Sequence, residues 1–153
     1  MSSTKINYKL EQAFKIVLTA QQTAIAANFT AHDASTLPNT RDPYTISKAI
    51  GGPEFPRDTG NRKVKIDVSV YGTTFNNTDA DPHDDAAANH AERVAAVFDV
   101  IKDDNFKSLL SAAVDDFYAY DVKEIDTPDH TVEEEKFKDT MTFEVYCCPC
   151  DVT

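Results

Sequence analysis

The stretch KVKIDVSVYGTTF, residues 63–75, decides the fold class of this chain. Val64, Ile66, Val68 and Val70 alternate with charged and polar residues. Side chains two positions apart on a strand point to the same face of a sheet. We therefore expect one face of this strand to be buried and the other to face water, which is typical of an antiparallel sheet rather than of a parallel sheet buried on both faces.

Three further segments have the character of strands. Residues 44–50, YTISKAI, carry a weak strand pattern. Residues 117–125, FYAYDVKEI, place apolar side chains on both faces, and residues 140–149, TMTFEVYCCP, alternate apolar and polar positions again. Together with residues 63–75, these segments predict a sheet of about four strands.

Apolar residues at three- and four-residue spacing predict helices on both sides of the central strand. The first runs from about Tyr8 to Ala27, the second covers AAANHAERVAAVFDVIKDD at residues 86–104, and NFKSLLSAAVDD at residues 105–116 predicts a short third helix. This order of elements fits one α+β domain over residues 1–153, with an antiparallel or mixed sheet and helices packed on one face.

Long irregular segments separate these elements. Residues 29–43 and 51–62 are rich in Gly, Pro and other turn formers and are predicted as loops, and residues 126–139 are predicted as a charged connection. Loops of this length are uncommon in a domain of this size. Such loops commonly become ordered against a neighbouring subunit.

The charge of the chain is unevenly distributed. The net charge is -11, yet residues 1–75 hold nine Lys and Arg against six Asp and Glu, while residues 76–153 hold six against twenty. A surface this negative repels nucleic-acid phosphates and disfavours sequence-specific DNA binding. A small basic patch around Arg57, Arg62, Lys63 and Lys65 stays open as the alternative to this expectation.

The location of the protein is predicted from what the sequence lacks. No run of 18 apolar residues predicts a membrane span, and the N-terminus shows no signal-peptide pattern. The three cysteines are clustered at the end of the chain, which is a poor disulfide framework. We therefore expect the protein to be made and kept in a cytosol.

The acidic stretch DADPHDD, residues 79–85, is interpreted as the start of a helix. Asp81 suits the N-cap, Pro82 the first helical position, and Asp84 the third position of a capping box. A metal site is the alternative, because hard cations prefer several carboxylates from one loop. The residues of that alternative are Asp79, Asp81, Asp84 and Asp85.

The cysteines and histidines are interpreted as packed side chains rather than as metal ligands, redox groups or catalytic residues. Cys147, Cys148 and Cys150 lack the second ligand pair of a structural zinc site and the helix N-terminus of a redox site, although either role remains an alternative. His90 lies on the apolar stripe of the second helix and is interpreted as a hydrogen-bonded core or interface histidine. Neither a Gly-x-Ser-x-Gly elbow nor a phosphate-binding loop is present. We therefore predict no catalytic, cofactor-binding or metal-binding residues, and no enzyme.

The whole pattern resembles the tail-terminator, or tail-completion, proteins of long-tailed bacteriophages. The quoted elements are LEQAFKIVLTA, KVKIDVSVYGTT, HDDAAANHAERVAAVFDVI, LLSAAVDDFYAYDV and DTMTFEVYCCPCDV. The two stretches of sequence that resemble the family most are TMTFEVYCCPCDV and His-Ala-x-Arg-Val at residues 90–94. The resemblance covers nearly the whole chain as an order of elements and carries no catalytic signature.

The resemblance implies an α+β subunit of a six-membered ring in the virion, assembled in the host cytoplasm. The ring would cap the tail tube, stop its growth and join it to the neck, and DNA would pass through without specific binding. The family reading implies neither a cofactor nor an enzyme activity. Two alternatives stay open: another head–tail connector or tube protein, and a small metal-binding module or metal-dependent hydrolase that uses the aspartates or cysteines.

Charge and expected exposure suggest which residues contact other subunits or the tube and neck proteins. Basic and aromatic residues come from the second loop and the strand at residues 117–125, and acidic residues come from the charged connection. The candidate interface residues are Phe55, Arg57, Arg62, Tyr118, Tyr120, Glu133, Glu134 and Glu135.

Overall fold

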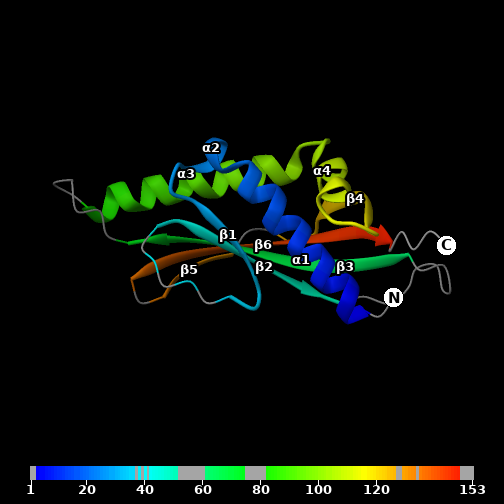
Figure 1. Ribbon diagram of the computed structural model, residues 1–153. Helices are drawn as coiled ribbons and strands as arrows, with labels where there is room; N and C mark the ends of the chain where they lie inside the picture. The colour runs from blue at the N-terminus through cyan, green and yellow to red at the C-terminus, as the bar shows by residue number, and fades with distance from the viewer. Residues whose placement is uncertain are drawn as a thin grey trace.

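The chain folds as helices packed on one face of a mixed sheet, as Figure 1 shows. The computed structural model describes residues 3–36, 38, 40, 42–51, 61–74, 82–126, 129–133 and 135–148. The elements are α1 (Ser3–Ala20), α2 (Gln22–Ile25), β1 (Thr30–Asp33), β2 (Tyr44–Ile50), β3 (Arg62–Thr73), α3 (Pro82–Lys102), α4 (Phe106–Ala113), β4 (Tyr118–Glu124), β5 (Asp129–Glu133) and β6 (Lys136–Cys148). This arrangement confirms the predicted α+β class.

The sheet is built around the long antiparallel pair β3 and β6. The strand order is β1-β2-β3-β6-β4, with β5 also paired to β6. Along the edge of β6 that faces away from β3, β5 pairs with the first residues of β6 and β4 with the last ones. β1 is parallel to β2, and the other pairs are antiparallel.

The apolar side chains that alternate along β3 and β6 form the centre of the hydrophobic core. Val64, Ile66, Val68 and Val70 of β3 are fully buried, as are Met141 and Val145 of β6. The helices cover this face of the sheet (Figure 1) and add buried residues from one side of α1: Ile6, Leu10, Phe14 and Leu18. Each such side chain contributes about 1.5–3 kcal/mol by leaving water.

α1 differs in its bounds from the predicted helix. It begins at Ser3, well before the expected Tyr8, because Ile6 continues the buried stripe one turn earlier. It ends at Ala20 instead of continuing to Ala27, and the separate turn α2 follows. The side-chain amide of Gln22 donates hydrogen bonds to the carbonyls of Ala27 and Phe29, at 2.8 and 3.0 Å, and so holds the chain where it turns into β1.

Two short strands lie where loops were predicted. β1 falls within residues 29–43, and β5 falls within the segment interpreted as a charged connection. β6 also begins at Lys136, four residues before the predicted start, because its first residues pair with β5 and β3. Among the described residues the sheet therefore has six strands, against about four expected. The predicted loop at residues 51–62 falls largely outside the described residues.

The face that α3 presents to the sheet also differs from the predicted stripe. The spacing of the sequence predicts a buried stripe made of Ala87, His90, Ala91, Val94, Val97, Phe98 and Ile101. His90, Val97 and Ile101 are buried as expected, but Ala86 is buried in place of Ala87, and both Ala87 and Ala91 are exposed. In the part of the chain that the structure describes, no helix is long and apolar enough to cross a membrane.

Candidate functional surfaces

The face of the sheet opposite the helices carries the polar half of the alternating strands. Across β3 and β6, Ser69 and Thr140 share a hydrogen bond of 3.0 Å, and the hydroxyl of Thr142 donates to Asp67 at 2.7 Å. The sequence alternates here because one set of side chains enters the core and the other set remains outside it. This outer face is thus a surface of hydroxyls, charges and aromatic rings.

A cluster of tyrosines and cations gathers at one end of this face. The ring centroids of Tyr118 and Tyr120 lie 6.2 Å apart, and those of Tyr120 and Tyr146 lie 6.4 Å apart. The ammonium of Lys123 lies 5.1 Å from the ring centroid of Tyr146. The ammonium of Lys63, which lies opposite Tyr146 in the sheet, is 5.5 Å from the same ring centroid. These five residues are called the aromatic end.

The aromatic end is open to solvent. Tyr118 is 49% exposed and Tyr120 is 37% exposed, and the side chain of Lys123 is 58% exposed. Exposed tyrosines combine a large apolar ring with a polar hydroxyl, and tyrosine is enriched at protein interfaces. The structure therefore brings together two of the predicted interface residues, Tyr118 and Tyr120. Arg62 lies opposite the buried Cys147 and so belongs to the face of the sheet that the helices cover.

An acidic group lies at the opposite end of β6. Asp129 and Glu133 of β5 are exposed, and Glu135 in the turn before β6 is also exposed. These three residues are called the acidic end. Along β6, Glu133 lies opposite Lys136 and Tyr118 opposite Cys148, so the outermost members of the two ends are about 40 Å apart at ~3.3 Å per residue. The nearest members, Asp129 and Lys123, lie opposite Thr140 and Glu144, about 13 Å apart along the strand. Figure 1 shows β5 and β4 at opposite ends of the long strands.

The other sequence-predicted residues are placed less fully. Phe55, Arg57, Glu134, Asp79, Asp81 and Cys150 lie outside the described residues. α3 begins at Pro82 and contains Asp84 and Asp85, but the side chains of this first turn are not among those described. The capping interpretation therefore stays a prediction.

Cys147 is buried at the end of β6 within the hydrophobic core. Burial raises the pKa of its thiol to about 12, with the neighbouring Cys148 adding to the effect against Arg62. A thiol held in this neutral form is a poor nucleophile and a poor metal ligand. Cys148, next to it, is half-buried.

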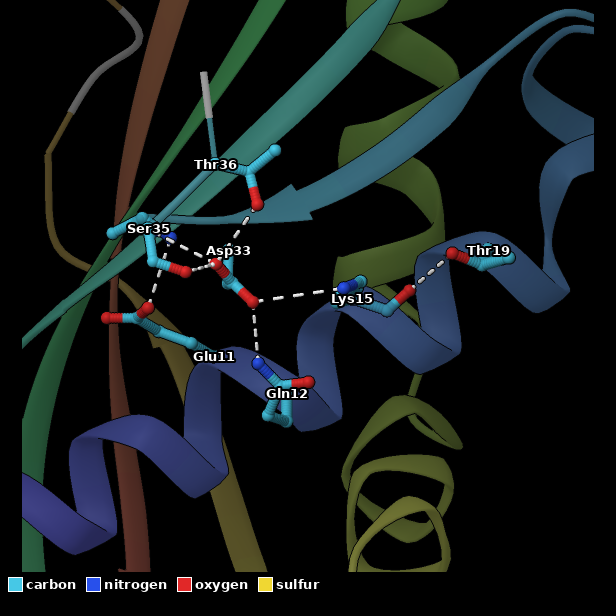
Figure 2. Close-up of polar contacts among 8 residues, drawn as sticks. Glu11, Gln12, Lys15, Thr19, Asp33, Ser35 and Thr36 are labelled. Carbon is cyan, nitrogen blue, oxygen red and sulfur yellow. Dashed lines mark hydrogen bonds and ion pairs between the residues drawn. The ribbon is translucent and has the colours of Figure 1, made fainter. Parts of the chain in front are cut away.

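A polar cluster that the sequence did not reveal joins α1 to the end of β1. Asp33 is only 6% exposed, and Figure 2 shows its carboxylate facing Gln12 and Lys15 of α1. It accepts hydrogen bonds from the Gln12 amide at 2.7 Å and from the N–H and hydroxyl of Ser35 at 2.9 and 2.5 Å. Gln12 belongs to α1 and Ser35 follows β1, so these hydrogen bonds hold the helix against the end of the strand. The cluster is therefore interpreted as structural.

Glu11 adds two further hydrogen bonds between α1 and the sheet. Its two carboxylate oxygens accept hydrogen bonds from the N–H groups of Ala34 at 3.1 Å and of Ala49 at 2.9 Å. One side chain of α1 therefore connects the backbone after β1 to the backbone of β2. The signal in the sequence was weak, because Glu11 and Asp33 are single polar residues far apart along the chain.

No family model matches the sequence, and no curated protein matches it significantly.

Proposed function

We propose that this chain is the tail terminator of a long-tailed bacteriophage, a structural subunit. Each copy binds the next through two different surfaces, and the copies close into a ring. The observation that carries the proposal is the separation of two unlike ends along β6. One end presents tyrosines with Lys63 and Lys123, and the other presents Asp129, Glu133 and Glu135. Two unlike patches that complement each other form a heterologous interface, which closes into a ring when the rotation between subunits allows it.

The chemistry of the two ends supports such a contact. Carboxylates of one copy would face the lysine ammonium groups of the next, which steers association and fixes its register. The rings of Tyr118 and Tyr120 would supply the apolar area that becomes buried at the centre of the contact. A surface salt bridge alone contributes little, so the tyrosines are expected to provide most of the affinity.

The proposed role explains the acidity of the chain. A ring with a net charge of -11 per subunit would not retain DNA that passes through its lumen, because phosphate contacts by Lys and Arg dominate DNA affinity. In this role the chain acts without catalysis or a cofactor. Its partners are further copies of itself, six to a ring, together with the tube protein below and the neck protein above. The proposed location is the neck of the virion.

Charge reversal at the two ends tests the proposal. The variants are Glu133→Lys at the acidic end and Lys123→Glu at the aromatic end, with Glu92→Lys on α3 and Lys107→Glu on α4 as exposed controls. Light scattering and negative-stain imaging should show rings for the wild type and for both controls. Each end variant alone should dissociate toward monomers, because like charges then meet across the contact.

A mixture of the two end variants provides a sharper test. In an alternating ring, the two substituted side chains would face each other at one contact, as an ion pair of reversed polarity, and the native pair would meet at the next. Equimolar mixing should therefore restore rings of even number. A wild type that stays monomeric at every concentration would contradict the proposal, and so would a mixture that fails to assemble. Long helical filaments would instead favour a tube protein.

A further inference from the structure

Three potential metal ligands converge between α3 and the β5–β6 hairpin. The register of the hairpin sets His130 opposite Asp139, and α3 brings His90 above them. Nε2 of His90 lies 2.8 Å from Oδ1 of Asp139, and Nδ1 of His130 lies 2.5 Å from the same oxygen. The three ligand atoms lie within 4.8 Å of one another. This group is called the His–Asp–His cluster.

Neighbouring residues hold the two imidazoles in place. The ring of Phe137 stacks on His90, with centroids 5.3 Å apart, and on His130, with centroids 5.8 Å apart. Gly72 lies under His90, where a Cβ atom would approach Nδ1 to 2.6 Å. The absence of a side chain at residue 72 therefore leaves the space in which the imidazole of His90 sits.

The cluster is closed on one side and open on the other. His90 is 2% exposed, and the side chains of Asp139 and His130 are 16% and 54% exposed. Burial lowers the pKa of His90, against the opposing hydrogen bond and charge of Asp139. A neutral imidazole is the form that binds metal ions. The exposed side at His130 provides an entry path from solvent.

We propose that His90, His130 and Asp139 bind one divalent transition-metal ion of the zinc class, with water in the remaining position. Two nitrogens and one carboxylate oxygen suit zinc and its neighbours, whereas Ca²⁺ and Mg²⁺ prefer sites made of oxygen alone. Zinc bonds of about 2.0–2.2 Å require the nitrogens to move away from the oxygen by less than about 1 Å. Rotation of exposed His130 provides much of that movement.

Such an ion would join α3 to the hairpin that carries the acidic end. The hairpin strand β5 is exposed along its whole length and pairs only with β6 among the described strands. A bond from His130 and Asp139 through the ion to His90 would fix the hairpin against the helix layer. The inference does not depend on the proposed ring, because the three ligands belong to one chain.

Metal binding by the untagged full chain tests the inference. Protein stripped with a chelator is titrated with ZnCl₂ by calorimetry, and its melting temperature is recorded with and without zinc. We expect one zinc ion per chain and a higher melting temperature with zinc, because the ion binds only the folded site. Co²⁺ should give the visible absorption bands of a four-coordinate site, and Ca²⁺ and Mg²⁺ should have no such effect.

Variants locate the site. His130→Ala and Asp139→Asn should weaken zinc binding by about tenfold or more. His130 is exposed, so that variant is expected to fold even if a His90 variant does not. His32→Ala on β1 is the matched histidine control and should bind as the wild type does.

Two results would overturn the inference. One is the absence of stoichiometric zinc binding to the folded wild type. The other is binding that persists unchanged in His130→Ala and Asp139→Asn but is lost in Cys148→Ser, which would place the ion on the thiols.

Discussion

Gly72 of β3 lies directly beneath the imidazole of His90, where a methyl group would stand 2.6 Å from Nδ1 and 3.3 Å from Cγ. The ring cannot swing aside freely, because it is hydrogen-bonded to Asp139 and buried against Phe137. We therefore expect Gly72→Ala to lower the free energy of unfolding by about 1–3 kcal/mol, as overpacking does in other cores. Urea denaturation measures this change.

The same substitution in a His90→Ala background is the control. Removing the imidazole removes the atoms that the new methyl group would meet, so Gly72→Ala should then be nearly neutral. A double-mutant cycle gives the coupling between the two sites. An equal loss in both backgrounds would show that the contact with His90 is not the cause.

Asp33 makes stability depend on pH in the acid range. The hydroxyl of Ser35 is the main cause that lowers the pKa of Asp33 from 3.8 to about 2, and Gln12, the Ser35 N–H and Lys15 add to it against the effect of burial. Because the folded-state pKa lies below the unfolded-state value, the carboxylate stabilises the fold fully above about pH 4. This contribution is lost as the pH falls through 2.

Asp33→Asn should therefore lower the free energy of unfolding by about 2 kcal/mol at pH 7, with a smaller difference from the wild type near pH 2. Asp99→Asn, on the exposed side of α3, is the matched control and should change little at either pH. Denaturant unfolding at a series of pH values measures both variants. A difference between Asp33→Asn and wild type that stays constant down to pH 2 would contradict the account.

The regular part of the fold could be predicted because its signals are local. β3 and β6 alternate over many residues, and the apolar spacing continues for several turns in α1 and for about two turns in α4. β1 and β5 lack such signals: β1 has four residues of which two are half-buried or exposed, and every residue of β5 is exposed. These two segments become strands because they pair with the longer strands β2 and β6. That pairing depends on the tertiary structure and leaves no local pattern in the sequence.

The candidate sites were only partly predictable for a related reason. Tyr118 and Tyr120 could be selected as surface residues because the strand carries apolar side chains on both faces. His130 and Asp139 could not, since they meet only after the hairpin register is set, and the sequence between them contains no short turn signal. His90 was recognised as a buried, hydrogen-bonded residue, but its partner was not.

Cys147 is expected to resist alkylation in the folded protein. Its thiol is buried and its pKa is raised to about 12, so little thiolate forms near pH 8. Treatment with iodoacetamide at pH 8, followed by peptide mass spectrometry, should leave Cys147 unmodified while it reacts in urea. Rapid labelling of Cys147 without denaturant would show that the end of β6 opens readily.

Ser111 is expected to hold the aromatic end in place. Its hydroxyl accepts a hydrogen bond from the N–H of Ala119 at 2.9 Å and lies 3.1 Å from the carbonyl of the same residue, so it joins α4 to the outer edge of β4. Ser111→Ala leaves that N–H without this partner and should lower the free energy of unfolding by about 1–2 kcal/mol. Amide hydrogen exchange at Ala119 should also become faster.

Ser108→Ala on the same helix separates this effect from helix propensity. Ser108 is exposed, and alanine is the better helix former, so the substitution should be neutral or slightly stabilising. If both variants behave alike, the hydroxyl of Ser111 does not hold β4. The strand that carries Tyr118 and Tyr120 is held by α4 on one edge and by β6 on the other. If only Ser111→Ala speeds exchange in β4 and also weakens ring assembly, the position of these two tyrosines depends on α4.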